Sequence, residues 1–452
     1  MPCALPPPPC ATAALHAAAP ECLEAWGLPE LDTSEAPARP HPPLPELTER
    51  DSYGTLYSAS SEHLVLRWDS GVDAEQAQSV LADGEIALEV LVEQLGMVGP
   101  KGADTHKLNL YLGDSGANAP PAYGEAYAWT DAEGYPMVVL SPEVLADWEL
   151  GRVVLAHELF HVLQDNSPHP YAYEPGAPGA WLYEASAVWS EAQVWPDEPL
   201  TARWIFGWSL QPQHPLDAFA YPSSGDIAEY RQYGAFAFLR YLSGEHGDAL
   251  VVDLWTQASD PDPRVTLSDW LDLDAELADF AAAAVTWDLE QGADLEAAHL
   301  AAAERWPQWD ERIAAQHRGH SEGWQSLELE ELGVLYVRLH PSSDEEDVRV
   351  EVSDFNGEVR VVIPGSGAHR LAPGADQTFE GTASADEVWL VLTGSHDGGV
   401  QAVEYRLRSV SAGPIQERVQ EGCGCSGEGS AALIWLPLLT LGLLRRRREW
   451  SA

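Results

Sequence analysis

Hydrophobic and polar residues follow two different periods along the first third of the chain. In "EHLVLRW" (Glu62–Trp68) and "HKLNLYLG" (His106–Gly113) they alternate, which is typical of β-strands. "GEAYAWTDAEGYPMVVLS" (Gly124–Ser141) contains two further strand-like runs around a D-A-E-G turn. From Asp73 to Met97 apolar residues recur at helical spacing, and Asp73 is a suitable N-cap residue. The pattern predicts a small mixed sheet combined with helices.

The rest of the chain is first helical and then β-rich. A long helix is expected from about Pro142 to Gln164, and the region from about Thr201 to Arg318 is expected to be mostly helical. From near Gly323, five or more short segments follow one another, separated by Gly, Asp and Ser. Within each segment polar and apolar residues alternate at period two, as in the strands of a β-sandwich. We therefore predict an α+β fold, with one domain over residues 51–320 and a β-sandwich over residues 323–411.

Both ends of the chain differ in composition from this globular part. Residues 1–50 are rich in Pro and Ala and read as a leader or linker, and residues 412–430 as a flexible Gly/Cys hinge. Residues 431–444 are apolar and uncharged, and Arg445–Arg448 follow. As a helix the apolar run would span only about 21 Å of a hydrocarbon core of about 30 Å, so a buried or interfacial helix competes. The arginine cluster favours a membrane stop with the arginines in the cytoplasm.

The hinge, the apolar segment and the arginine cluster together resemble the MYXO-CTERM sorting tag of myxobacterial surface proteins. The resemblance covers about residues 422–448 and implies a transmembrane sorting tag over residues 431–448. It also implies a sorting protease that acts near Cys423 or Cys425, and a location at the cell surface (the outer membrane) or outside the cell. Export requires an N-terminal signal, but in the leader "PPPP" interrupts the apolar run.

Charge and cysteine content narrow the classes of partner. The chain has 24 basic and 72 acidic residues, a net charge of −48, so nucleic acid and anionic lipid are excluded as expected partners. The cysteines are confined to the two ends of the chain: Cys3, Cys10, Cys22, Cys423 and Cys425. No disulfide can therefore form within the folded middle, which depends on packing or on a metal.

The stretch "VVLAHELFHVLQDN" contains the candidate chemistry. Because i and i+4 share one face of a helix, His157 and His161 can both bind one zinc ion. Glu158 lies about 100° around the axis, where it can take a proton from a zinc-bound water without binding the metal. The alternative is a buried helix with two ordinary histidines. Burying these three polar side chains among apolar neighbours is costly unless they are paired, which favours zinc.

The third ligand decides the class of zinc site. The metzincin pattern requires Gly and His at the positions of Gln164 and Ser167, so it is excluded. The better candidate is Glu184, which lies 23 residues past His161 in the amphipathic segment "GAWLYEASAVWSEAQVW". Glu174, in the intervening loop, is a competing candidate.

At these motifs the chain resembles the gluzincins, zinc metallopeptidases with HExxH and a Glu on the following helix. "WLYEASAVWSE" is similar to that family's W-L-x-E-G-x-A-x-Y-x-E signature. The resemblance implies a zincin-like catalytic domain in which His157, His161 and Glu184 bind zinc and Glu158 is the catalytic base. Glu191 would be a supporting or substrate-facing carboxylate, or simply an exposed helix residue. Ala185 stands where the signature has Gly, and Val188 stands where some gluzincins carry an acidic residue four positions after the ligand Glu. The second departure leaves the orienting partner of the first histidine open.

Two further parts of a peptidase site have candidates. Tyr230 and Tyr233, in "AEYRQYGAFAFLRYL", could each stabilise the oxyanion as in related gluzincins, and the register does not decide between them. The strand Ala126–Thr130 could bind an extended peptide along its edge, as edge strands do in zincins.

The expected function is zinc-dependent hydrolysis of peptide bonds in a peptide or protein substrate, at the cell surface or outside the cell. Whether the enzyme is an endopeptidase or an exopeptidase stays open. The alternatives are a zinc-binding but inactive surface adhesion or binding module, and a structural surface protein in which HExxH is accidental.

Overall fold

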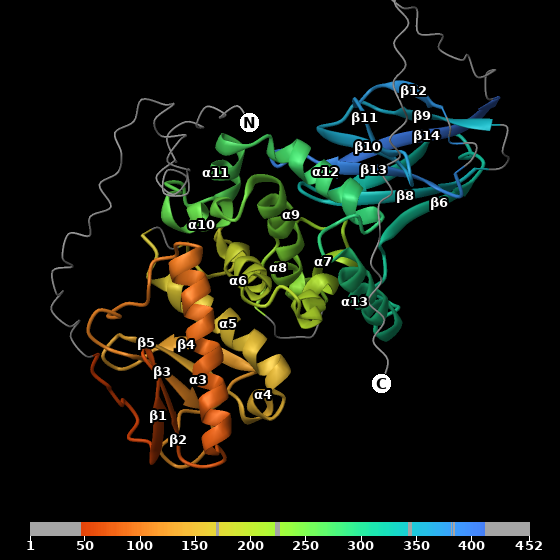
Figure 1. Ribbon diagram of the computed structural model, residues 1–452. Coiled ribbons are helices and arrows are strands. Elements are labelled where there is room, and N and C mark those ends of the chain that lie inside the picture. Colours follow the sequence, from red (N-terminus) through yellow and green to blue (C-terminus); the bar gives the residue numbers. More distant parts are fainter. Residues whose placement is uncertain are drawn as a thin grey trace, which may run out of the picture.

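The computed structural model describes residues 47–411, apart from 169–170, 222–226, 342–345, 381 and 383–384. Within this part the chain is α+β, with a mixed sheet, a helical middle and two C-terminal β-sheets (Figure 1), which confirms the α+β part of the predicted fold class. Residues 1–46, the Gly/Cys hinge and the predicted transmembrane sorting tag of residues 431–448 lie outside the described residues, as do all the cysteines. None of the described helices is both long enough and apolar enough to cross a membrane.

The first sheet has the strand order β1-β2-β3-β5-β4. Its strands are β1 (Tyr57–Ser60), β2 (Leu64–Trp68), β3 (Leu108–Leu112), β4 (Ala126–Thr130) and β5 (Pro136–Leu140). The three central strands are parallel, whereas β1 and β4 pair in antiparallel fashion at the two edges. The D-A-E-G turn joins β4 to β5, where the Asp131 carboxylate accepts hydrogen bonds from the N–H groups of Glu133 and Tyr135. Sequence reasoning thus located the edge strand β4 correctly.

Helices cover one face of this sheet (Figure 1). α3 (Ala74–Leu88) begins with a capping box at Asp73, as predicted, and continues into the π-helical turn η1 (Glu89–Gln94). The single helix predicted from Pro142 is two helices, α4 (Pro142–Ala146) and α5 (Trp148–Asp165). The chain turns at Asp147, where ψ is 82°, and the Trp148 indole N–H donates to Asp83 of α3 at 2.7 Å. A contact with a neighbouring helix therefore accompanies the break.

The helical middle surrounds α6, which packs against α5 and α9. Its elements are α6 (Ala180–Val194), η2 (Pro199–Ile205), α7 (Phe206–Ser209), η3 (Ile227–Tyr230), α8 (Arg231–Gly234), α9 (Phe236–His246), α10 (Ala249–Thr256), α11 (Pro263–Trp270), α12 (Leu273–Val285) and α13 (Gly292–Arg305). Almost every residue of α6 is buried, including Trp181 and Trp189. A helix buried on all sides holds its polar side chains in fixed places, which matters for the site below.

The C-terminal part consists of two sheets that share one apolar core. Their orders are β11-β10-β13-β8-β6 and β12-β9-β14-β7. The strands are β6 (Ile313–Arg318), β7 (Gln325–Leu329), β8 (Val334–His340), β9 (Glu346–Val352), β10 (Gly357–Ile363), β11 (Gly367–Leu371), β12 (Asp376–Phe379), β13 (Val388–Gly394) and β14 (Gln401–Ser411). β6 lies inside the region predicted to be helical and pairs in parallel with β8. The alternating run of polar and apolar residues in this segment is too short to predict a strand. β6 is therefore recognised only from its pairing with β8.

These sheets are joined to the helical middle by apolar and polar contacts. α12 lies along β10 and β13 (Figure 1). The Tyr336 hydroxyl donates to the Ala281 carbonyl at 3.0 Å, and Arg360 forms an ion pair with Asp279 at 2.6 Å. Trp389 and Val391 belong to the same apolar core as the helices. One face of the sheet that contains β10 and β13 therefore packs into the core of the helical part, while the second core lies between the two C-terminal sheets.

Candidate metal centre

α5 and α6 bring together the three residues that the sequence proposed as ligands. His157 and His161 lie one turn apart on α5, and Glu184 lies on α6, which packs against it. The Nε2 atoms of the two histidines are 3.1 Å apart. Oε2 of Glu184 lies 3.1 Å from His157 Nε2 and 3.5 Å from His161 Nε2. Within the described part of the chain, this is the group of His, Cys, Asp and Glu side chains that could hold a metal ion.

The size of this triangle fits a tetrahedral ion with nitrogen and oxygen ligands. Zinc binds such ligands at about 2.0–2.2 Å, so neighbouring ligand atoms in a tetrahedron are about 3.3 Å apart. The three observed separations are 3.1, 3.1 and 3.5 Å. Three ligand atoms also leave one tetrahedral position open, as catalytic zinc sites do. The residues present therefore fit a zinc ion.

His157 is oriented by a buried carboxylate. Its Nδ1 lies 2.9 Å from Oε1 of Glu191, whose residue is fully buried on α6. Arg203 of η2 donates to the same carboxylate at 2.6 and 3.0 Å. A carboxylate accepts but does not donate, so Nδ1 carries the proton and Nε2 is free for a metal. Glu191 is thus a supporting residue rather than an exposed helix carboxylate.

His161 is oriented by an amide. Its Nδ1 lies 2.6 Å from Oε1 of Gln164. The amide nitrogen of Gln164 donates to the Tyr183 carbonyl at 2.9 Å and to the Ser186 hydroxyl at 3.0 Å. These two acceptors fix the oxygen of the amide toward His161, so Nδ1 again donates and Nε2 stays free. In the sequence Gln164 served only to exclude the metzincin pattern, and its role depends on α6.

Glu184 is held by a tyrosine that sequence reasoning missed. The Tyr173 hydroxyl, in the loop between α5 and α6, donates to Oε1 of Glu184 at 2.5 Å. The other oxygen, Oε2, faces the histidines. Because Oε1 is bonded to Tyr173 and only Oε2 faces the histidines, Glu184 is suited to bind a metal ion through one oxygen. Glu174, the competing candidate, lies beside Tyr173 in sequence but does not belong to the metal-binding group.

The electrostatics of the group favour a cation. Burial alone would lower the pKa of His157, but the bonds to Glu184 and Glu191 outweigh it and raise the pKa to about 10. Burial likewise opposes the charge of Glu184, yet the two histidines hold its pKa well below the usual range. The same carboxylates that favour a proton on the imidazoles favour a divalent ion in its place.

Glu158 lies beside the group without belonging to it. Its side chain is buried and lines the same cleft as the histidines. Burial raises the pKa of Glu158, while the two histidines and the Ala128 backbone N–H of β4 act in the opposite direction. A carboxyl with a raised pKa is a stronger base once it is ionised.

The group lies at the bottom of a cleft of about 880 Å³. The cleft is lined by Tyr53, Pro121, Tyr123, Ala126, Tyr127, Ala128, Trp129, Met137, His157, Glu158, His161, Asp165, Tyr173, Tyr183, Glu184 and Tyr233. The edge strand β4 thus forms one wall, as the sequence proposed. Tyr233 reaches the cleft and its ring stacks on His157 at 6.3 Å between centroids. Tyr230 packs on Trp204 and Phe206 instead and does not line the cleft.

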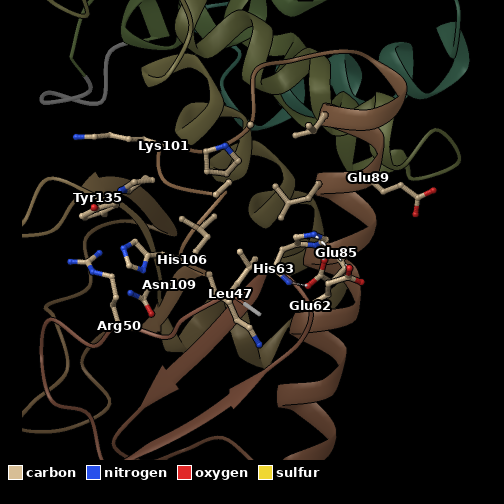
Figure 2. A pocket seen from close by; sticks show the side chains of 18 of the residues that line it. Leu47, Arg50, Glu62, His63, Glu85, Glu89, Lys101, His106, Asn109 and Tyr135 are labelled. Carbon is tan, nitrogen blue, oxygen red and sulfur yellow. Dashed lines mark hydrogen bonds and ion pairs between the residues drawn. The ribbon is translucent and has the colours of Figure 1, made fainter. Parts of the chain in front are cut away.

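A second cavity, of about 470 Å³, lies by α3, η1 and the segment before β3 (Figure 2). Both lysines of the chain, Lys101 and Lys107, line it. Figure 2 shows Lys101, Tyr135, His106 and Arg50 on one side and Glu62, Glu85 and Glu89 on the other. Among the described residues the metal-binding group belongs to the first cleft, which is therefore the candidate functional site.

Comparisons with known proteins give a family but no described activity. No curated protein matches the chain. A de novo designed double-stranded β-helix matches at 16% identity, over 19% of this chain and 97% of its own, with a TM-score of 0.14. The lysozyme inhibitor PliG of Salmonella Typhimurium matches at 7% identity, over 21% of this chain and 99% of its own, with a TM-score of 0.14. Scores this low carry no argument about fold or function.

The family match covers the candidate site. The profile of a family of unknown function, DUF6055, matches residues 43–368, which include the first sheet, all of the helical middle and the C-terminal strands through β10. His157, His161, Glu184 and Glu191 all lie within it. The chain therefore belongs to the DUF6055 family, whose function is unknown.

Proposed function

We propose that this protein is a zinc-dependent peptidase of the gluzincin type. The observation that carries the proposal is the buried triangle of His157 Nε2, His161 Nε2 and Glu184 Oε2, with sides that fit tetrahedral zinc. Each imidazole has its other nitrogen bonded to an acceptor, which is the arrangement that metal-binding histidines use. A buried group of this kind is costly to keep unless the charges are compensated, as a bound cation would do.

Glu158 is proposed as the general base and then the general acid. A bound zinc ion supplies Lewis acidity and lowers the pKa of water at its open position. Glu158 takes a proton from the attacking water as the new C–O bond forms at the peptide carbonyl. It returns that proton to the amide nitrogen as the C–N bond breaks, so the products are a carboxylate and an amine. Its place beside His157 on α5, in the cleft and outside the ligand triangle, supports this role.

Two walls of the cleft provide substrate binding and oxyanion stabilisation in this proposal. β4 is an edge strand, so its outer backbone groups can pair with an extended peptide. Tyr233 is the better of the two predicted tyrosines for the oxyanion, because it lines the cleft beside His157. Tyr173 holds Glu184 through its hydroxyl, and Tyr233 also interacts with Glu184. The place of Tyr233 against the His157 ring is therefore what favours it.

The proposed place of action is outside the cell or at its surface. The support is the sequence of the C-terminal end, with its Gly/Cys hinge, the apolar run of residues 431–444 and Arg445–Arg448. In this proposal a sorting protease acts near Cys423 or Cys425, and the membrane is a partner through the apolar run.

The test separates zinc binding from catalysis. Zinc content is measured on the purified protein and on His161→Ala, and casein cleavage is measured with and without chelator and in Glu158→Gln. We expect about one zinc per chain, its loss in His161→Ala, and cleavage abolished by chelator and by Glu158→Gln. Equal zinc in both proteins contradicts the site, and undiminished cleavage by Glu158→Gln contradicts the mechanism. Zinc binding without any cleavage would favour the inactive binding module.

A further inference from the structure

One carboxylate in the cleft has no role in the metal group. Asp165 is the last residue of α5, four residues after His161, and lines the cleft. Its carboxylate makes no hydrogen bond or ion pair with any residue that the structure describes; the nearby charge that acts on it is that of His161. Asp165 is exposed to solvent, and the protein beside it covers enough of the carboxyl to raise its pKa against the attraction of His161. An exposed carboxylate on the wall of a cleft can form a charge-assisted hydrogen bond with a cationic group that enters the cleft.

The cleft as a whole favours positive charge. With the charge of Glu184 offset by the proposed zinc ion, the charged side chains left in the lining are Glu158 and Asp165, and the lining contains no Lys or Arg. The chain around it carries 72 acidic and 24 basic residues. A cleft lined by one sign of charge raises the local concentration of ligands with the opposite sign. Acidic peptides are disfavoured there for the same reason.

Two tyrosines line the cleft together with Asp165, and the charge of Asp165 acts on the Tyr183 hydroxyl. Tyr173 and Tyr183 both line the cleft, with ring centroids 5.2 Å apart in an edge-to-face arrangement, and Tyr173 is 39% exposed. Both hydroxyls are already engaged as donors, with Glu184 and with the Tyr171 carbonyl. Tyr183 is buried and packs behind Tyr173, so the ring surface that a ligand can reach is that of Tyr173. Ring surface next to a carboxylate suits a guanidinium or ammonium group on an aliphatic stem.

Taken with the proposed peptidase function, on which this step rests, the geometry points to the class of substrate. We propose that Asp165, with Tyr173 and Tyr183, forms a subsite for a cationic group of the peptide substrate, so that the enzyme cleaves basic peptides. Four helical residues rise about 6 Å, and an extended peptide advances about 3.3 Å per residue. The cationic group therefore belongs to a residue within about two positions of the cleaved bond.

Two sources of positive charge are distinguished by the choice of peptides. One is an Arg or Lys side chain, and the other is the α-amino group of a substrate cleaved close to its N-terminus. Paired fluorogenic peptides carry either Arg or citrulline, its neutral near-isostere, at each position near the cleaved bond, and each pair is made with a free and with an acetylated N-terminus. The zinc-loaded wild-type chain is compared with Asp165→Asn. Glu174→Gln serves as the control, because Glu174 follows the cleft residue Tyr173 in the sequence but does not itself line the cleft.

For the wild type we expect kcat/KM to be about tenfold or more higher for the cationic member of a pair, as for a charge-assisted hydrogen bond. This advantage should shrink with added salt. Asp165→Asn should reduce it to about twofold or less, with unchanged zinc content. Glu174→Gln should keep it. A side-chain subsite gives the effect in acetylated peptides, whereas an α-amine subsite gives it only with a free N-terminus.

Failure of this inference can be told apart from failure of the peptidase proposal. If chelator and Glu158→Gln abolish cleavage but Asp165→Asn keeps the full preference for Arg, the subsite is wrong and the peptidase stands. If no peptide is cleaved, the same Arg and citrulline peptides are labelled with fluorescein. Their binding to the zinc-loaded Glu158→Gln variant is then measured by fluorescence anisotropy. A preference for Arg that disappears in Glu158→Gln/Asp165→Asn supports the subsite without catalysis, and equal binding of both peptides overturns it.

Discussion

Glu191 gives the sharpest test of how the metal group is built. In Glu191→Gln the new amide oxygen can still accept a bond from His157 Nδ1, so the shape of the contact is retained. What is lost is the negative charge of Glu191, which in the wild-type protein is fully buried, with Oε1 2.9 Å from His157 Nδ1. The substitution therefore isolates the electrostatic contribution of Glu191 to the metal site.

The expected loss of zinc affinity is about tenfold to a hundredfold. A hydrogen bond to a charged group contributes about 1.5–3 kcal/mol, against about 0.5–1.5 kcal/mol for a neutral pair. The difference of about 1–1.5 kcal/mol corresponds to about tenfold in Kd. Loss of the carboxylate also makes the imidazole a weaker ligand, and outer partners of metal-binding histidines typically contribute 10–100-fold to affinity.

The assay is a competition titration with a chromophoric zinc chelator at pH 7.5, with thermal unfolding of the zinc-free protein as the measure of folding. Glu198→Gln is the matched control, since Glu198 pairs with Arg152 at 2.7 Å close by but does not touch a histidine. Both variants remove the partner of a partly buried arginine, so both should lower the unfolding temperature. Only Glu191→Gln should weaken zinc binding. Wild-type zinc affinity in Glu191→Gln would refute the inferred role of Glu191.

Four further outcomes are expected. Tyr233→Phe should lower kcat about 100-fold with unchanged zinc content, whereas Tyr230→Phe should leave kcat within about twofold, because only Tyr233 lines the cleft. Tyr173→Phe, which loses the bond to Glu184, should weaken zinc binding about tenfold in the same titration. Removal of zinc by a chelator should lower the unfolding temperature, and zinc added at about 1,000 times its Kd should restore about 4 kcal/mol. Burial, with repulsion from Arg312, lowers the pKa of His299 to about 4, so the unfolded chain takes up a proton below about pH 6.5 that the folded chain does not. Stability should therefore fall with falling pH, by about 2 kcal/mol from pH 7 to pH 5 in urea unfolding, and His299→Gln should remove this part of the slope.

Local patterns in the sequence were sufficient for some of these features. HExxH places two histidines on one face of a helix wherever that helix lies, so the pairing of His157 and His161 followed from spacing alone. The edge strand β4 and the cap at Asp73 followed in the same way from alternation and from residue type. Each of these depends on residues close together in the chain. The break at Asp147 did not follow, because the apolar spacing runs through it without interruption.

Other features depend on contacts that no local pattern contains. Tyr173 lies in a loop whose path is set by the packing of α5 on α6, so its bond to Glu184 has no signature in the letters around it. Gln164 could be seen only as a residue that is not glycine, because both of its amide partners lie on α6. Tyr230 and Tyr233 are three residues apart on one amphipathic stretch and both stack on Trp204, so only the contacts with Phe206 for Tyr230 and with His157 for Tyr233 distinguish them.

The departure at Val188 shows how the same requirement can be met by a different residue. Because some gluzincins carry an acidic residue four positions after the ligand Glu, we looked for a carboxylate at Val188, and its absence appeared to leave His157 without an orienting partner. In the structure, the imidazole lies between two carboxylates of α6, with Glu184 3.1 Å from Nε2 and Glu191 2.9 Å from Nδ1. Seven residues make two helical turns, so both carboxylates leave the same face of α6, about 10 Å apart along its axis. The ring and its two contacts together span most of that distance, so a partner two turns away suits an imidazole that lies along the helix. The spacing of seven between Glu184 and Glu191 is therefore the part of the pattern that matters for this site.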